Sequence, residues 1–335
     1  GMTVGSAAVD LHPEIMILSR IRKTIDGEGY ACAQLECIGE SVGCLAILGQ
    51  YSHLLQVDLS RNLIFDAGPL NALQHVQSVN LASNGIRSLA SWDPSSQSHL
   101  LFLDVSDNQL PSLPKLEMPA LRSANFARNQ ICSCESFGGH RRLEFLDISG
   151  NLLTSLQGVC KMPALSKLNA GGNKLASLDG LEELPVLETL DISKNGCESI
   201  DGPWEEMPRL TSLDASANKI AESSGLQQLQ RLPTLRLLEV SANPVEEQEE
   251  INLKLEILIF HKELTMISGE EVTEDEVEEA RELQEKRIEE ERQRAEEERL
   301  AAEAEAEARA EEERLKAEAE AEAAEAGAAE GEEES

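Results

Sequence analysis

The stretch LEFLDISGNLL, residues 143–153, contains the pattern from which the fold can be read. Leucine or isoleucine alternates with polar residues, then Asn151 interrupts the run and another leucine follows, giving the template Leu-x-x-Leu-x-Leu-x-x-Asn-x-Leu. Matches to this template recur along the chain at steps of 21 to 25 residues. Their asparagines are Asn62, Asn84, Asn108, Asn129, Asn151, Asn173, Asn195, Asn218 and Asn243.

A repeat of this length and pattern is a leucine-rich repeat, which contributes one short strand to a stacked solenoid. CAQLECIGESV, residues 32–42, fits as a degenerate first repeat with Glu40 in the asparagine position. The sequence therefore predicts an α/β solenoid of about ten repeats over residues 30–245. Its parallel strands should line a concave face, and at about 4.8 Å per strand the arc should be roughly 45 Å long.

The asparagine of each repeat is predicted to be structural, because its amide can satisfy backbone groups enclosed between successive coils. One repeat, LSKLNAGGNKL, invites a different interpretation, since Gly171 and Gly172 precede Asn173 and Lys174 as in a loop that binds phosphate. The spacing Gly-x-x-x-x-Gly-Lys-Ser/Thr is missing, however. We therefore interpret this segment as one more turn of the solenoid.

The segment before the repeats, residues 1–29, is expected to cap their N-terminal end. Pro13 is followed by Ile15, Leu18 and Ile21 at helical spacing, and glycine follows, which predicts a helix over the exposed core of the first repeat.

Three further segments follow the repeats. An apolar stretch within residues 246–272 should close the C-terminal end of the solenoid. Thr273 and Glu276 form a capping box that starts a long charged α-helix over residues 273–326. Its apolar positions keep no steady heptad, which favours a lone or partner-bound helix over a coiled coil. Residues 327–335 are expected to be a disordered acidic tail.

Charge limits the partners of the chain. The net charge is −33, of which −20 falls from residue 270 onward, where 29 acidic residues face 9 basic ones. Such a chain repels nucleic acid and anionic lipid, so neither RNA, DNA nor a membrane is an expected partner. No apolar run is long enough for a transmembrane helix, and the start of the chain lacks a secretory signal pattern. The seven cysteines lack paired spacings, which favours an intracellular, reducing compartment.

Catalysis is not expected, since no hydrolase, kinase or metalloprotease motif is found. We predict no catalytic residue, no metal site, no cofactor and no small-molecule substrate. Two groups of residues have side chains that can bind a metal. His53, His75 and His99 precede consecutive repeats and could stack as a metal-binding column, or they could merely reuse one register. Cys132 and Cys134 lack two further ligands and are interpreted as loop thiols.

The outward positions of the predicted strands supply the candidate partner-binding site. One column is entirely acidic or amide, and it could select a basic segment or serve local hydrogen bonds. The column two residues earlier contains Phe102 and Phe145, which suggest an aromatic anchor unless flanking loops cover them. The candidate residues are Asp58, Phe102, Asp104, Phe145, Asp147, Lys167, Asp191, Asp214 and Glu239.

The order of parts resembles a known family. A degenerate opening EGYACAQLECIGESV, short repeats from YSHLLQVDLSRN, and a closing NPVEEQEEINLKLEILIFHKELTMISGEEV before a charged helix are similar to axonemal leucine-rich-repeat proteins of motile cilia. That resemblance implies a non-enzymatic scaffold of the ciliary or flagellar axoneme, bound to other axonemal or radial-spoke proteins. The chain departs from the family in LTMISGEEV and in its long Ala-Glu segment.

Two other classes of leucine-rich-repeat protein remain open as alternatives. A regulatory subunit of protein phosphatase 1 would also use the concave face, although that family has no need of a charged helix of this length. An acidic nuclear phosphatase inhibitor or histone chaperone would carry a tail of nearly pure Asp and Glu, whereas this one interleaves nine Lys/Arg.

Overall fold

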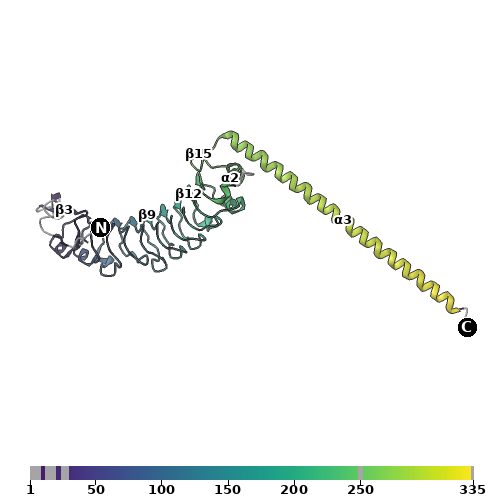
Figure 1. The fold of residues 1–335 in the computed structure, drawn as a ribbon, viewed down its shortest axis with the longest axis horizontal. Helices are drawn as coiled ribbons and strands as arrows, with labels where there is room; N and C mark the ends of the chain where they lie inside the picture. The colour runs from purple at the N-terminus through teal and green to yellow at the C-terminus, as the bar shows by residue number, and fades with distance from the viewer. Residues whose placement is uncertain (1–8, 12–19, 24–29, 248–251, 333–335) are drawn as a thin grey trace, which may run out of the picture. The chain divides into compact units, whose positions relative to one another are not determined.

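A computed structural model describes residues 9–11, 20–23, 30–247 and 252–332. The strands of the repeats belong to one sheet of 13 strands on the concave side of an arc (Figure 1). Ten parallel strands match the ten predicted repeats: β3 (Tyr30–Glu36), β5 (Gln56–Asp58), β6 (Ser78–Asn80), β7 (Phe102–Asp104), β8 (Ser123–Asn125), β9 (Phe145–Asp147), β10 (Lys167–Asn169), β11 (Thr189–Asp191), β12 (Ser212–Asp214) and β13 (Leu237–Glu239). The predicted leucine-rich-repeat solenoid is therefore confirmed.

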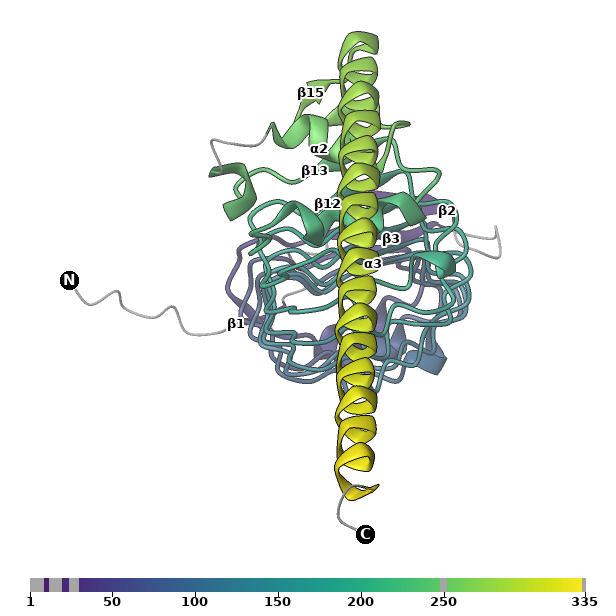
Figure 2. The same ribbon diagram turned by 90° about the vertical axis from the view of Figure 1, so that its right-hand side faces the viewer.

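The strands stay in register along the whole array, because every repeat places the same three template positions in its strand. The middle residue points into the core: Leu35, Leu103, Leu146 and Leu190 are at most 2% exposed. The residues before and after it point outward, as alternation in a strand requires. Seen end-on in Figure 2, the coils overlie one another, so a residue type repeated at one template position forms a column.

The segments that return from one strand to the next are mostly extended, with short 3₁₀ turns. These turns are η1 (Ala46–Gln50), η2 (Gly68–Ala72), η3 (Pro94–Ser96), η4 (Trp204–Glu206), η5 (Ser223–Arg231) and η6 (Pro244–Glu247). A coil of 21 to 25 residues leaves little chain for a longer helix once the strand and its asparagine turn are formed. Leucines of these segments complete the core on the convex side.

Each template asparagine joins neighbouring coils as predicted. The Nδ2 of Asn151 donates to Phe126 O in the preceding coil at 3.0 Å and to Ile148 O at 2.8 Å. Its Oδ1 accepts from Ile131 N at 3.0 Å. The residue before Asn151, Gly150, has φ +63°, and the equivalent residues of the other repeats, for example Arg61 and Lys194, also have positive φ. The sequence analysis missed this left-handed position, because glycine occupies it in a minority of repeats.

The N-terminal edge differs from the predicted capping helix. Residues 20–23 form strand β2 (Arg20–Lys23), which pairs antiparallel with β3, and Ile21 is 67% exposed rather than buried in a cap. An open sheet edge favours another strand, since pairing satisfies its free backbone groups. β1 (Val9–Asp10) pairs with β4 (Val42–Cys44). The rest of the predicted helix lies outside the described residues.

The C-terminal end continues the array one step beyond the predicted boundary at residue 245. Strand β14 (Met266–Ile267) adds to β13 in parallel, and β15 (Glu270–Glu271) turns back on it. Helix α2 (Leu253–Phe260) buries Ile257 and Leu258. LTMISG, residues 264–269, keeps the first half of the template but lacks its asparagine, which is why the count of repeats stopped too early.

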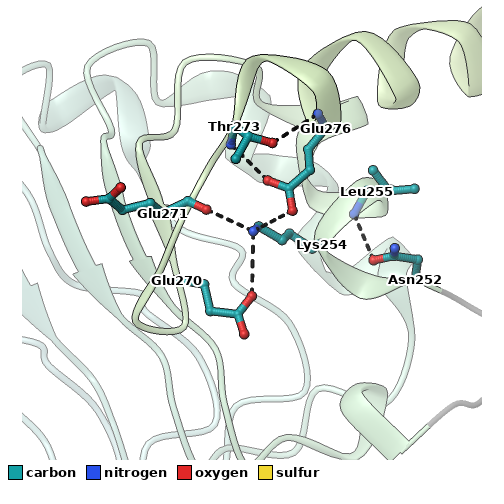
Figure 3. A network of polar contacts seen from close by, with 7 residues as sticks. All are labelled: Asn252, Lys254, Leu255, Glu270, Glu271, Thr273 and Glu276. Carbon is teal, nitrogen blue, oxygen red and sulfur yellow. Dashed lines mark hydrogen bonds and ion pairs between the residues drawn. The ribbon is translucent and has the colours of Figure 1, made fainter.

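A polar network holds this cap to the start of the next helix (Figure 3). Lys254 of α2 donates to Glu276 Oε1 at 2.7 Å and to Glu271 O at 2.9 Å, with Glu270 Oε2 at 3.6 Å. Glu276 also forms the predicted capping box: Thr273 N donates to its Oε2 at 2.9 Å, and its own N donates to Thr273 Oγ1 at 3.3 Å. Hydrogen bonding from Lys254, then from Thr273, lowers the pKa of Glu276.

Helix α3 (Glu274–Glu332) is 59 residues long and belongs mostly to a second compact unit, residues 278–335. Within it, Arg281, Arg299 and Arg309 each approach a glutamate three or four positions away. The helix passes the predicted end at residue 326, because the alanines and glutamates around Gly327 outweigh a glycine cost of about 1 kcal/mol. Thus residues 327–332 are helical, which corrects that part of the predicted disordered tail, and its residues 333–335 lie outside the described residues. Among the described residues, no helix combines the length and apolarity needed to cross a membrane.

Candidate partner-binding face

The structure brings the nine candidate residues onto the concave face in two adjacent columns. Phe102, Phe145 and Lys167 lie in the column before the buried leucine, and the acids lie in the column after it. Phe102 is 51% exposed, and Phe145 is half-buried. Ser123 of β8 lies between the two phenylalanines in register, so the rings stand two strands apart across a small residue. Phe102 and Phe145 are thus the two aromatic residues of this column.

The acidic column uses part of its hydrogen-bonding capacity locally. In Asp104, Oδ1 accepts from Ser106 N at 2.9 Å and from Ser106 Oγ at 2.6 Å. The same two bonds recur at Asp147 and Asp214 with the serine two residues later. The local-hydrogen-bond interpretation of this column is thus correct for one oxygen of these carboxylates.

The hydrogen bonding of the second carboxylate oxygen, Oδ2, differs between the two halves of the concave face. In the N-terminal half, aspartate alternates with asparagine, and the amide donates across the strands: Asn80 to Asp58 at 3.0 Å, and Asn125 to Asp104 at 3.0 Å. Asn169 does the same to Asp147 at 3.3 Å. These carboxylates are therefore largely satisfied within the sheet.

In the C-terminal half the alternation ends. Asp191, Asp214 and Glu239 follow one another in register on β11, β12 and β13 with no amide between them. Within the described part of the chain, Oδ2 of Asp191 and of Asp214 accepts no hydrogen bond. Three adjacent carboxylates with unused oxygens make this end the more favourable one for a Lys or Arg of a partner.

The sequence reasoning missed two features of the face. One is apolar: Leu237 is 42% exposed and pairs in register with Met266 of β14, which is 36% exposed, beside the three acids. The unrecognised eleventh strand concealed this pair. The other is the rule that aspartate is followed by serine at the second position, whereas Asn80, Asn125 and Asn169 are followed by alanine or glycine. The sequence carried that signal, because the serine supplies an amide and a hydroxyl donor, and a charged carboxylate oxygen is a stronger acceptor for them than an amide oxygen.

The two glycines of the repeat LSKLNAGGNKL have structural roles next to the concave face. Gly171 N donates to Asn169 Oδ1 at 3.1 Å, and a Cβ at Gly171 would lie 2.9 Å from Ser193 Oγ. Gly172 has φ +66° and occupies the left-handed position common to the repeats. Both glycines are therefore explained by the solenoid, without a phosphate.

The histidine and cysteine candidates do not assemble into a metal site in the described residues, where no cluster of three potential ligands is found. The rings of His75 and His99 lie 5.8 Å apart and are tilted by 35°. Cys132 is exposed, but Cys134 is 1% exposed, and burial, followed by the effect of Cys132, raises its pKa to about 12. Cys134 is thus a core residue, not the loop thiol that was predicted.

Comparison with known proteins agrees with the fold. No model of a known protein family matches the chain. Leucine-rich repeat-containing protein 23 of Homo sapiens and that of Bos taurus are each 32% identical over 142 residues, which cover 42% of this chain and 34% of theirs. An uncharacterized leucine-rich repeat-containing protein of Schizosaccharomyces pombe is 40% identical over 74 residues, 21% of this chain and 12% of that protein.

Among solved structures, the crystal structure of the TLR13–ssRNA13 complex superposes with a TM-score of 0.61 at 21% identity. The match covers 72% of this chain and 36% of that one, and it shows the fold alone. The chain spans about a third of the length of the curated relatives named leucine-rich repeat-containing protein 23. It is therefore a leucine-rich-repeat solenoid with partial sequence similarity to leucine-rich repeat-containing protein 23.

Proposed function

We propose that the chain is a non-enzymatic scaffold of the ciliary or flagellar axoneme, a structural subunit of the radial spoke, whose concave face holds a segment of another axonemal protein. The observation that carries the binding role is the aromatic pair on the concave strands, in which Phe102 is 51% exposed and Phe145 is half-buried, in a chain that has 3% aromatic residues. Similarity to leucine-rich repeat-containing protein 23 and the order of parts at both ends of the solenoid support the axonemal assignment.

The partner segment is expected to be apolar at one end and basic at the other. The surface formed by Phe102, Ser123 and Phe145 would take an apolar side chain, since aromatic residues dominate binding energy at protein interfaces. The three consecutive carboxylates from Asp191 to Glu239 would take Lys or Arg. About four strands separate Ser123 from Asp214, which at 4.8 Å per strand corresponds to roughly 20 Å, or six residues of an extended segment.

Substitution of both phenylalanines tests the concave face. We expect Phe102→Ala with Phe145→Ala to weaken capture of identified spoke subunits from salt-extracted axonemes by about tenfold or more. The melting temperature should stay near that of the unmodified chain, because Phe102 is half in solvent and Phe145 only half-buried. Phe65→Ala is the matched control, since Phe65 is 69% exposed but lies outside the strands. Equal capture by both variants would remove the aromatic anchor from the proposal.

Fractionation of cilia tests the location separately. The protein is followed by antibody through detergent extraction and then through high-salt extraction. Retention in the detergent-insoluble axoneme, together with loss from axonemes that lack radial spokes, is the expected result. Recovery in a soluble fraction with a protein phosphatase, or in the nucleus, would favour the regulatory-subunit or chaperone alternative.

A further inference from the structure

The segment that returns from β8 to β9 departs from its neighbours at residues 138–142. In the neighbouring coils a proline follows the buried methionine or leucine at this point, as in Pro119, Pro163 and Pro185. Here Arg141 takes the proline position and is followed by Arg142. Two residues before Arg141 stands Gly139, at the position where the neighbouring coils carry Glu117, Lys161 and Glu183. The segment therefore gains two cations and lacks one side chain.

The missing side chain accompanies a hollow in the surface. Gly139 has φ +86°, and a Cβ there would lie 2.1 Å from Cys160 O, so its backbone packs directly on the following coil. The hollow around Gly139 has a volume of about 610 Å³, and a second hollow of about 910 Å³ shares three of its lining residues. The shared residues are Arg141, Arg142 and Lys161, hereafter called the basic site. None of the lining residues belongs to a concave strand.

Hydrogen bonds of the backbone and of His140 hold the basic site in place. His140 is buried, its Nε2 lies 3.0 Å from Met118 O in the preceding coil, and its Nδ1 accepts from Arg142 N at 3.2 Å. On the other side, Lys161 N donates to Glu182 O at 3.3 Å in the following coil. The three cationic side chains are nevertheless exposed. The site thus combines a fixed backbone with accessible charges.

The three cations have no anionic partner in the described part of the chain, where no ion pair or side-chain hydrogen bond involves them. Glu117 lines the same hollow but lies 2.6 Å from Lys115 Nζ. Glu206, at the far side of the second hollow, accepts from Glu183 N at 3.2 Å. A chain with 62 acidic and 29 basic residues offers each cation many possible partners. Three unpaired cations on shared hollows therefore favour an anion from outside.

The acids on either side of the basic site limit the kind of anion that fits. Glu117 and Glu183 occupy the same template position three coils apart, which at 4.8 Å per coil is roughly 14 Å. An extended segment advances about 3.3 Å per residue, so an acidic run of more than about four residues would meet one of these carboxylates. A phosphorylated side chain concentrates a charge of about −1.5 to −2 in one group, which fits between them. Two arginines also present the forked donors that phosphate oxygens accept from in pairs.

We propose that the basic site binds a phosphorylated serine or threonine in a segment of a partner protein. Pro119 and Pro163 are exposed and line the hollows on the two sides of the site, so apolar residues next to the phosphorylated one would contact them. This surface is separate from the concave face, and the proposal does not rest on the axonemal assignment.

Competition binding on the full chain tests the proposal. The probe is N-acetyl-Leu-phosphoserine-Leu-amide carrying a dye without net charge, followed by fluorescence anisotropy at about 50 mM salt, where charge screening is modest. The unlabelled phosphopeptide should displace the probe at concentrations about tenfold lower than the serine peptide requires. Inorganic phosphate, which lacks the leucines, and a peptide with three consecutive glutamates should also be about tenfold weaker competitors.

Variants assign the binding to the basic site. Arg141→Gln with Arg142→Gln should weaken the phosphopeptide about tenfold or more, and the corresponding pair of lysines, which keeps the charge without the fork, about threefold. Lys174→Gln with Lys194→Gln is the matched control, because it removes two exposed cations that line neither hollow. Its affinity should stay within about twofold of the unmodified chain.

Three results would overturn the proposal. Equal competition by the serine peptide would remove the phosphate, and an unchanged affinity in Arg141→Gln with Arg142→Gln would remove the site. Inorganic phosphate or the glutamate peptide competing as well as the phosphopeptide would mean that the hollows take a free anion or an acidic run instead.

Discussion

Asn151 shows how a single side chain makes separate coils cooperative. It is 4% exposed and connects its own turn to the carbonyl of Phe126 and the amide of Ile131 in the preceding coil. The Ile131 amide would otherwise be enclosed without a partner, and Phe126 O would keep only its bond from Asn129 Nδ2. Leaving a buried backbone group without a hydrogen-bond partner costs about 1 to 3 kcal/mol. The hydrogen bonds of the Asn151 side chain therefore contribute more to stability than its packing does.

Replacement of Asn151 should therefore destabilise the whole solenoid. We expect Asn151→Ala to lower the free energy of unfolding by about 3 kcal/mol, measured by urea denaturation. Gln157→Ala is the control, because Gln157 is an exposed amide in the same coil, and it should change stability by less than about 0.5 kcal/mol. A loss of similar size in both variants would mean that the asparagine column is not the joint between coils.

His140 is a buried imidazole in a position where the two neighbouring coils carry Met118 and Met162. Its Nε2 lies 3.0 Å from Met118 O, and its Nδ1 accepts from Arg142 N at 3.2 Å, which fixes a neutral ring. Burial lowers the pKa of His140 below the ordinary 6.5, although the bond to Met118 O acts in the opposite direction. The unfolded chain therefore binds a proton at a higher pH than the folded one.

A stability loss on acidification should follow from His140. Because its folded pKa is depressed, its contribution to stability is constant above about pH 6.5 and is lost as the pH falls from there toward the folded pKa. We expect His140→Met to lose less stability than the unmodified chain between pH 7.5 and pH 5, measured by denaturation at each pH. The difference between the two chains cancels the titration of the many carboxylates. Identical pH profiles would show that His140 does not contribute.

At the scale of elements, the strands and their register were predictable, because the asparagine repeat fixes which three residues form each strand. The two ends of the sheet were not predictable in this way. β2 was mistaken for helix because Ile15, Leu18 and Ile21 have helical spacing, whereas the free edge of β3 favours a strand. β14 was missed because LTMISG has no asparagine. In each case a neighbouring element, rather than local sequence, decides the structure.

The candidate site was predictable to a similar degree. The sequence placed Phe102 and Phe145 on one face, because both occupy the same template position. It could not give their unequal exposure, which depends on the residues of flanking coils.

The capping box at the start of α3 was predicted from Thr273 and Glu276, and the two hydrogen bonds between these residues confirm it. We expect Thr273→Ala to increase amide hydrogen exchange in the first turn of α3 about fivefold, which corresponds to a typical cap contribution of about 1 kcal/mol. Glu276→Gln should have a smaller effect, because glutamine can still accept from Thr273 N although the charge facing Lys254 is lost. Exchange that is unchanged in Thr273→Ala would show that Lys254 and packing alone hold this turn.

At the scale of the molecule, the chain consists of two compact units with different sources of stability. Residues 1–277 contain the stacked leucine core, and the described part of the second unit, residues 278–332, is one helix whose described side chains are mostly exposed. A helix rich in alanine and glutamate is stabilised by propensity and by ion pairs of about 0.2 to 0.5 kcal/mol each. Stability of the solenoid should therefore not depend on the length of α3.

Truncation after Ala280 tests this independence. The shortened chain keeps Thr273, Glu276 and their contacts with Lys254, so the cap of the solenoid remains complete. We expect one cooperative unfolding transition with a melting temperature within about 2 °C of the full chain, and loss of the helical circular dichroism contributed by the remaining 52 residues of α3. Truncation after Glu263 is the contrasting variant, because it removes β14 and exposes the edge of β13. If the chain ending at Ala280 unfolded as broadly as the one ending at Glu263, the helix would be part of the folding unit and the boundary near residue 277 would be misplaced.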